Sequence, residues 1–179
     1  MKILLFGSSG GIGSAIKDSL NGHQVVCPTR SAPLTVFPNE EKFDLIIFAQ
    51  GQIDESEVLD TFDANIIGII LLTDRFLISS ERFIFISSTA GIKGNAMFPV
   101  YAASKAALNI YSKSMALRYT GKQFYSICPG PTDTKMWRSL GLRGEAQAPS
   151  EIAKVVQRII NSEFKSGDII TVRDGKVTV

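Results

Sequence analysis

The sequence predicts a doubly wound α/β domain, in which helices cover both faces of a parallel sheet to give three α/β/α layers. Short apolar runs such as residues 3–6 and 45–48 do not alternate with polar residues. Continuous apolar runs are typical of strands that are buried on both faces. Segments with apolar residues at helical spacing separate these runs, as they do in parallel sheets.

Length and composition limit the number of domains and the class of partner. A chain of 179 residues fits one domain, so we expect residues 1–179 to fold as a single unit. The net charge is +2, and the charged residues are scattered without long runs. This pattern favours a small-molecule partner over a nucleic acid or a membrane surface.

The two cysteines and the apolar segments bear on location. Cys27 and Cys128 each end a strand-like run, so we predict buried free thiols, no disulfide and a reducing cytoplasmic location. The apolar run near the start is too short for a secretion signal, and no run approaches the roughly 18 residues of a membrane span. We therefore expect a soluble protein.

A glycine-rich turn follows the first predicted strand. Residues 7–13 read G-S-S-G-G-I-G and stand between the strand 3–6 and a helix that begins near residue 14. Strand, glycine turn and helix in this order are the context of a dinucleotide-binding fingerprint. We expect Gly7 to permit the sharp turn, Gly11 to let backbone approach a pyrophosphate, and Gly13 to let the helix pack on its strand. A tight turn that binds nothing is the alternative.

The second predicted strand, 25–27, leads to Arg30. An acidic residue after this strand binds the ribose 2′-hydroxyl of NAD, whereas an arginine accommodates the 2′-phosphate of NADP. No acid stands here, so Arg30 favours NADP(H) over NAD(H), unless it is an ordinary surface residue. Only thirteen residues then precede the strand 44–49, which is too few for two helical crossovers. We expect at most one short strand, 34–37, and a reduced adenine side of the pocket.

The rest of the chain alternates helices and strands. We predict helices at 56–80, 101–120 and 149–164, and strands at 82–87, 124–128 and 168–172. The stretch 129–148 contains glycines, prolines and the only tryptophan, Trp137, and is a candidate lid over a pocket. We expect no metal site, since no spacing of residues along the sequence indicates one.

Tyr101 and Lys105 carry the chemistry that we predict. They stand four residues apart on a predicted helix, so the phenol and the ammonium share one face. A cation beside a phenol favours the phenolate and lowers its pKa toward a value useful for proton transfer. Ser88, at the end of the run F-I-F-I, would bring a second hydroxyl to the same edge of the sheet. The alternative is a structural role, with the tyrosine in the core and the lysine in solvent.

Five segments in order resemble the short-chain dehydrogenase/reductase family, in its compact single-domain form. They are G-S-S-G-G-I-G at 7–13, Asn65, I-S-S-T-A-G at 86–91, Y-A-A-S-K at 101–105 and P-G-P-T-D-T at 129–134. The resemblance spans essentially the whole chain and implies a Rossmann-type, NAD(P)-binding domain. It implies an oxidoreductase that transfers a hydride between NADP(H) and a small carbonyl or alcohol substrate. The thirteen-residue step from Ser88 to Tyr101 is closer to reductases of this family than to its epimerases.

The resemblance also implies roles for individual residues. Tyr101 would be the acid/base, Lys105 would lower its pKa and bind the nicotinamide ribose, Ser88 would hold the substrate oxygen, and Asn65 would complete a proton relay. The expected cofactor-binding set is Gly7, Ser9, Gly11, Ile12, Gly13, Arg30, Gly51, Tyr101, Lys105, Thr132 and Thr134.

Two departures from the family pattern bear on the function. The family's Asn-Asn-Ala-Gly segment is Phe48-Ala49-Gln50-Gly51 here, and the chain is short between Arg30 and residue 44. They motivate an alternative, a catalytically weak NADP(H)-binding sensor or interaction protein on the same fold.

Two further expectations concern the pocket and the assembly. Met97, Phe98, Met136, Trp137 and Leu140 predict an apolar substrate pocket, or a lid that packs on the protein. Apolar residues left over on helices 56–80 and 101–120, namely Ile67, Leu71, Ala106, Ile110 and Ala116, predict a homodimer or homotetramer.

Overall fold

The computed structural model describes residues 1–29, 41–142 and 144–179. One seven-stranded sheet crosses the molecule in the order β2-β1-β3-β4-β5-β6-β7. All neighbouring strands are parallel except β6 and β7, which are antiparallel. The strands are β1 (Lys2–Phe6), β2 (Gln24–Val26), β3 (Leu45–Phe48), β4 (Arg82–Ile86), β5 (Gln123–Pro129), β6 (Ile169–Arg173) and β7 (Lys176–Thr178).

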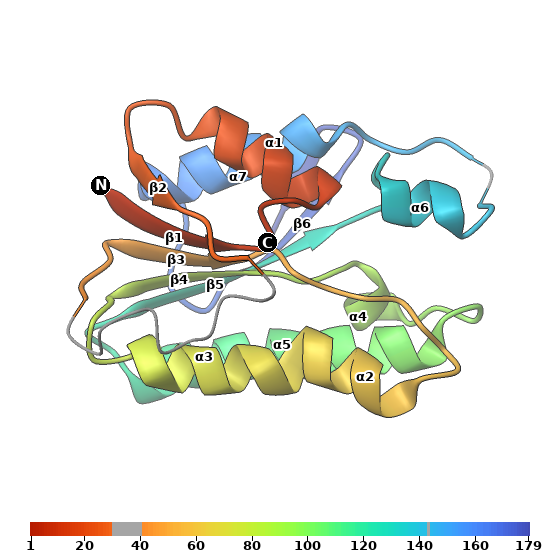
Figure 1. The fold of residues 1–179 in the computed structure, drawn as a ribbon, viewed down its shortest axis with the longest axis horizontal. Helices are drawn as coiled ribbons and strands as arrows, with labels where there is room; N and C mark the ends of the chain where they lie inside the picture. The colour runs from red at the N-terminus through yellow and green to blue at the C-terminus, as the bar shows by residue number, and fades with distance from the viewer. Residues whose placement is uncertain (30–40, 143) are drawn as a thin grey trace.

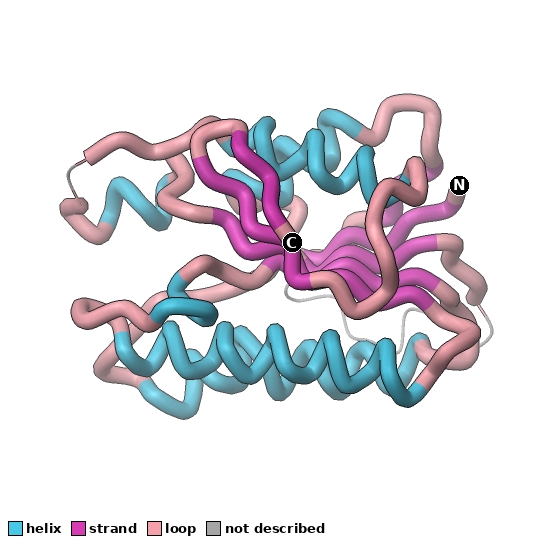
Figure 2. Tube along the Cα trace, turned by 180° about the vertical axis from the view of Figure 1, so that it is seen from behind, coloured by secondary structure: helices cyan, strands magenta, loops and turns pink. Residues whose placement is uncertain are grey.

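Helices cover both faces of the sheet, as predicted (Figure 1). On one face lie α1 (Gly11–Ser19) and α7 (Pro149–Ile160). On the other lie α2 (Val58–Phe62), α3 (Gly68–Phe76) and α5 (Pro99–Arg118). Seen from behind, the same three layers are evident, with the strands between two rows of helix (Figure 2). Two short helices, α4 (Ala90–Lys93) and α6 (Lys135–Ser139), lie toward the end of the sheet at which β5 points (Figure 1).

Two apolar cores follow from the continuous apolar strands. Successive residues of β1 and β3 point to opposite faces, and all four residues of β3 are fully buried. The core toward α1 and α7 is aliphatic, with Ile16 and Val156 among its members. The core toward α3 and α5 is aromatic, since Phe6, Phe48 and Phe85 stack with ring centroids 5.2 and 5.4 Å apart. Burial on both faces is what the runs without alternation predicted.

The predicted helix 56–80 is a single rod divided into three parts. Between α2 and α3 lies η2 (Asp63–Ile67), a π-helical segment. The extra residue in a π-turn shifts the side chains that follow around the axis, and such turns are frequent at functional sites. Asn65 lies inside this turn and is fully buried. Helical periodicity in the sequence gave no indication of it.

The strand β7 was missed by the sequence prediction, which ended the sheet at residue 172. Arg173 and Lys176 pair across a hairpin whose two central residues, Asp174 and Gly175, have φ of 50° and 75°. Positive φ at both central residues defines the type I′ turn, for which Asp-Gly is a preferred pair. The signal was therefore present in the sequence. The final helix also ends earlier than predicted, at Ile160 instead of residue 164.

Gly91 determines how closely α4 and the turn after β4 pack against α5. A Cβ placed on Gly91 would lie 2.5 Å from the carbonyl carbon of Lys105. Helix α4 can therefore approach the backbone of α5 closely only because residue 91 is glycine. This contact brings the turn after β4, which carries Ser88, against the first half of α5.

Candidate active site

The glycine loop has the geometry that was predicted for it. Gly7 has φ of +76°, and a Cβ there would lie 2.5 Å from the backbone nitrogen of Gln50. A Cβ on Gly13 would lie 2.0 Å from the carbonyl oxygen of Gly7, so only glycine lets α1 start this close to β1. The helix has Gly10 as N-cap and therefore no capping side chain. Its first N–H groups suit an anion such as a pyrophosphate.

The two distant segments predicted to hold the cofactor meet at the start of α1. A Cβ on Gly11 would lie 2.7 Å from Cγ2 of Thr134. The hydroxyl of Thr134 in turn accepts a hydrogen bond from the backbone N–H of Trp137 at 3.1 Å and caps α6. Ile12 lines a pocket beside this contact, the one that also contains Tyr101, whereas Ser9 is exposed on the loop.

Ser88 and Tyr101 lie together at a pocket of about 380 Å³. The Ser88 hydroxyl lies close enough to the phenol of Tyr101 to act on its pKa, and Ser88 Oγ accepts the backbone N–H of Ala90 at 3.1 Å. The tyrosine comes from the first turn of α5 and the serine from the turn after β4. The structure thus brings the two predicted hydroxyls to one place.

Lys105 lies one turn along α5 from Tyr101 and is only 2% exposed. Its ammonium donates to the carbonyl oxygen of Ile86 at 3.0 Å and lies 5.8 Å from the centroid of the Tyr101 ring. Burial disfavours the charged form and lowers the pKa of Lys105 to about 8.

The predicted lowering of the tyrosine pKa is not present in this structure. Burial raises the pKa of Tyr101, while its hydrogen bond with Ser88 acts in the opposite direction. The spacing of Tyr101 and Lys105 reports the neighbouring charge but not the burial of the phenol. In the fold, the loss of hydration around the phenol outweighs a lysine whose ammonium is directed at a backbone carbonyl.

Asn65 connects the loop after β3 to α5, the helix that carries Tyr101 and Lys105. Its Oδ1 accepts the N–H of Gln52 at 2.8 Å, and its Nδ2 donates to the carbonyl oxygen of Gln52 at 2.8 Å and to Ser104 Oγ at 2.9 Å. Ser104 Oγ donates to the carbonyl oxygen of Tyr101 at 2.8 Å. Sequence reasoning did not identify Ser104, although it stands inside the Y-A-A-S-K segment.

Gly51 keeps a space open between Asn65 and Lys105. A Cβ at Gly51 would lie 3.3 Å from Asn65 Oδ1 and 3.3 Å from Lys105 Nζ. An acceptor and a donor therefore face the same position, which a larger residue would fill. Next to it, the Oε1 atom of Gln50 is buried without a hydrogen-bond partner among the described residues. This altered segment of the family pattern thus retains polar atoms that can bind a ligand.

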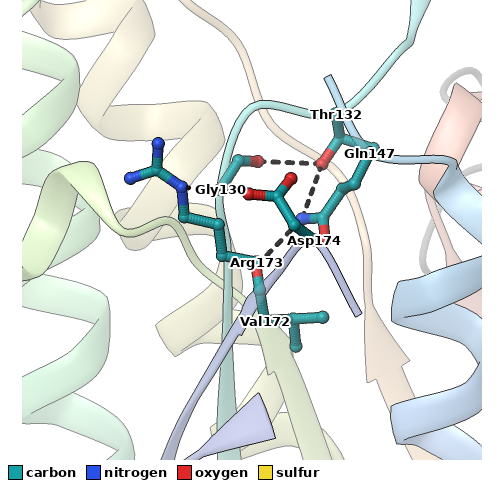
Figure 3. Close-up of polar contacts among 6 residues, drawn as sticks. All are labelled: Gly130, Thr132, Gln147, Val172, Arg173 and Asp174. Atoms are coloured by element: carbon teal, nitrogen blue, oxygen red, sulfur yellow. Dashed lines mark hydrogen bonds and ion pairs between the residues drawn. The ribbon is translucent and has the colours of Figure 1, made fainter. Parts of the chain in front are cut away.

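Thr132 is held by its own loop (Figure 3). Its hydroxyl donates to the carbonyl oxygen of Gly130 at 2.9 Å, and Gln147 Nε2 lies 3.5 Å from the same hydroxyl. Gln147 also donates to the carbonyl oxygen of Val172 at 2.9 Å. A β-bridge between Thr132 and Gln147 closes the base of the stretch 129–148, and α6 occupies its middle. Gln147 was another residue that sequence reasoning missed.

The apolar residues predicted for a substrate pocket or a lid line the pocket that contains Tyr101. Met97, Phe98, Met136, Trp137 and Leu140 surround Tyr101 and Ser88 together with Ile53. Arg30 lies outside the described residues, as does the predicted strand 34–37. The described helices include none that is long and apolar enough to cross a membrane.

A family model of short chain dehydrogenases matches residues 45–144, more than half of the chain. The protein belongs to the short-chain dehydrogenase/reductase family. Members of this family are NAD(P)-dependent oxidoreductases, and the matched region contains Asn65, Ser88, Tyr101 and Lys105.

Known members of the short-chain dehydrogenase/reductase family resemble the chain in sequence and in fold. Carbonyl reductase family member 4 of Danio rerio is 27% identical over 135 residues, which cover 66% of this chain and 56% of that protein. The chain thus spans little more than half the length of this relative. A short chain dehydrogenase family protein from Francisella tularensis subsp. tularensis SCHU S4 superposes with a TM-score of 0.82 at 21% identity, over 96% of both chains.

A small-chain dehydrogenase solved in complex with NADPH gives a TM-score of 0.81 at 20% identity, over 98% of this chain and 97% of that one. At these identities the two structures establish the fold of the present family member and no more.

Proposed function

We propose that the protein is an NADP(H)-dependent oxidoreductase that transfers a hydride between the cofactor and a small carbonyl or alcohol substrate. The observation that carries the proposal is that Ser88 and Tyr101 line the same largely apolar pocket, with the serine hydroxyl beside the phenol. Reduction of a carbonyl group builds negative charge on its oxygen, which requires a proton donor and a second hydrogen-bond donor. These two residues are the matching donors.

When bound, the nicotinamide supplies the hydride. The chain's own residues supply the proton and the hydrogen bonds. In the reductive direction, Tyr101 gives its phenolic proton to the substrate oxygen while Ser88 donates a hydrogen bond to the same oxygen. Lys105 and Asn65 face the position that Gly51 leaves open, and a water there would return a proton from solvent toward the tyrosine. The start of α1, with Gly11, Ile12 and Thr134 around it, would hold the pyrophosphate.

Cofactor binding would also change the pKa of Tyr101. Lys105 and Tyr101 are both buried, and burial shifts the pKa of each toward its uncharged form in the free protein. Hydrogen bonds from cofactor hydroxyls to the lysine would replace the hydration that it lacks and favour its ammonium form. A charged Lys105 would then lower the pKa of Tyr101, the effect that the sequence predicted.

Substitution of the tyrosine tests the mechanism. Tyr101→Phe keeps the ring and the helix, so stability and NADPH binding should change little. Carbonyl reduction should fall by about 10² to 10⁴, the range for loss of a positioned general acid. Turnover is followed by NADPH absorbance and binding by NADPH fluorescence. Tyr119→Phe, at a half-buried tyrosine that caps the far end of α5, is the control.

Two results would count against this mechanism. Near-normal turnover by the phenylalanine variant would mean that the proton comes from elsewhere. Binding of NADPH without turnover of any member of a broad carbonyl panel would favour the non-catalytic sensor.

The preference for NADP(H) over NAD(H) rests on Arg30. Arg30→Ala should weaken NADPH binding at least about ten-fold more than NADH binding, because only NADPH carries the 2′-phosphate. Titration of each cofactor against both proteins measures the difference. An equal loss for the two cofactors would overturn the assignment.

The remaining parts of the proposal concern organisation. We take residues 1–179 as one dinucleotide-binding domain that acts on small molecules in the cytoplasm as a homodimer or homotetramer. Both cysteines are free, in keeping with a reducing compartment. Ile67, Leu71 and Ile110 are exposed on the helices expected to pair, in keeping with an interface between copies.

A further inference from the structure

A second hollow opens beside the active-site pocket. It has a volume of about 480 Å³ and lies between the end of α4 and the hairpin of β6 and β7. Thr89, Lys93 and Arg173 line both this hollow and the pocket that contains Tyr101. The two spaces are therefore adjacent, and a ligand with its reactive end at the tyrosine can extend past these three side chains.

The charged side chains that line the two hollows are predominantly positive. Among the described residues that line the active-site pocket, the charged ones are Lys93 and Arg173. The second hollow adds one cation, Lys176, and one acid, Asp174. The described remainder of the pocket wall near Tyr101 is mainly apolar and contains no carboxylate. A negative group on a ligand would therefore find cations at the junction of the two hollows.

The only ion pair made by Arg173 among the described residues is weak. Its Nε lies 3.5 Å from Asp174 Oδ2, and both side chains are 61% exposed. Exposed pairs of this kind contribute roughly 0–1 kcal/mol, so a ligand anion can compete with Asp174.

The backbone before Arg173 and the first carbons of its side chain are nevertheless held in place. The preceding carbonyl, that of Val172, accepts hydrogen bonds from Gly130 N at 2.8 Å and Gln147 Nε2 at 2.9 Å. A Cβ on Gly130 would lie 3.3 Å from Arg173 Cγ, so the stem of the arginine lies close against this glycine. The terminal nitrogens point away from Thr132 and Gln147 (Figure 3). The stem of Arg173 is thus held in place, while its guanidinium group makes only the weak ion pair with Asp174 among the described residues.

These cations are not at the expected phosphate site of the cofactor. Ile12 and Thr134, which flank the start of α1, line the active-site pocket but not the second hollow. Lys93 and Arg173 are shared with the second hollow and so lie on the side away from the glycine loop. Their charge is available to the substrate.

We propose that the substrate is an oxo acid, a carbonyl compound whose carboxylate binds Lys93 and Arg173 while its carbonyl group faces Ser88 and Tyr101. The inference rests on the proposed function and names its substrate class. The apolar side chains between the two ends would contact the carbon chain. In the reaction the carbonyl carbon gains the hydride and its oxygen gains the tyrosine proton, and the carboxylate is unchanged.

A kinetic comparison of acids with their methyl esters tests the charge preference. Linear ω-oxo acids of four to ten carbons and their esters differ only in the anionic group. We expect kcat/KM to be about ten-fold or more higher for the acid at the optimal length, since charge-assisted hydrogen bonds are the strong ones. Lys93→Gln with Arg173→Gln should lower kcat/KM for the acid, mainly through KM, and should remove the preference. Lys113→Gln, an exposed lysine on α5 that lines neither hollow, is the control.

A binding experiment separates failure of this inference from failure of the proposed function. Trp137 is the only tryptophan and lines the pocket, so its fluorescence reports occupancy without catalysis. Octanoate should bind about ten-fold more tightly than methyl octanoate, the preference should weaken with salt, and the double variant should lose it. Equal binding of the two probes, or acid and ester reduced at equal rates, would overturn the oxo-acid assignment. Selective octanoate binding without any carbonyl reduction would support the anion site and count against the proposed reaction.

Discussion

The burial of Lys105 affects both its pKa and the pH dependence of folding stability. The ammonium has a backbone carbonyl as its hydrogen-bond partner and little contact with solvent, so its pKa falls to about 8 from the ordinary 10.5. Between these two values the unfolded chain holds a proton that the folded chain has lost. Folding stability from this group therefore rises as pH increases through 8.

A prediction follows for the pH dependence of unfolding. From pH 7 to pH 9, Lys105 should add about 1 kcal/mol to the free energy of unfolding. Lys105→Met should remove this increment, which urea titration of both proteins at several pH values measures. Burial raises the pKa of Cys128, which acts in the opposite direction near pH 9, but that thiol is common to both proteins. Parallel stability curves for the two proteins would show that the lysine stays charged in the fold.

At the residue scale, the sequence predicted the features that depend on neighbouring positions in the chain. Gly7, Gly13 and the four-residue step from Tyr101 to Lys105 depend on a few neighbouring positions, so their geometry was predicted correctly. The direction of the tyrosine pKa depends on hydration, which the whole fold determines. For the same reason, Ser104 and Gln147 acquire their roles only through contacts with residues far away in the sequence.

At the scale of elements, the helix that carries Tyr101 depends on a residue from another segment. Helix α5 has Phe98 as its N-cap, which offers no side-chain acceptor. Glu55 supplies the cap instead, because its two carboxylate oxygens accept the N–H groups of Val100 at 2.9 Å and Tyr101 at 3.0 Å. The carboxylate also opposes the positive end of the helix dipole.

Removal of this cap should affect both stability and turnover. Glu55→Ala leaves two N–H groups without their partner and should cost about 1 to 2 kcal/mol in unfolding by urea. Because one of these groups belongs to Tyr101, kcat should also fall several-fold, with a smaller change in KM. Glu57→Ala, an exposed glutamate two residues further along, is the control. If both variants behave alike, Glu55 does not position the helix.

Elements were predicted well where the pattern was periodic and poorly where one residue changed the register. The strands β1, β3, β4 and β5 were predicted to within two residues at each end. The π-turn around Asn65 was not predicted, because the apolar residues on either side of it recur at ordinary helical spacing and give no sign of the extra residue. The strand β7 is three residues long and exposed on part of its surface, so it has too few apolar positions to show a pattern.

For the whole molecule, the sequence indicated that helices cover both faces of the sheet, and its leftover apolar residues predicted that a second copy covers the helices on one face. Ile67, Leu71 and Ile110 lie on η2, α3 and α5 and are 45%, 63% and 62% exposed. These elements share one face of the sheet, where α2, α3 and α5 form a single layer (Figure 1). Apolar side chains gathered on one layer are typical of a protein interface.

The final prediction concerns this assembly. Light scattering should give a mass of at least about twice the 19.5 kDa of one chain, because a second copy would cover the exposed apolar residues. In a symmetric dimer each residue of the interface occurs twice, so a single charged substitution places two charges in it. Leu71→Glu and Ile110→Glu should therefore each shift the mass toward that of the monomer. Ile78→Glu, 93% exposed and beyond the end of α3, serves as the control and should leave the mass unchanged. A mass near 19.5 kDa at every concentration for the unmodified protein would show that these helices face solvent, and the proposed pairing would then be wrong.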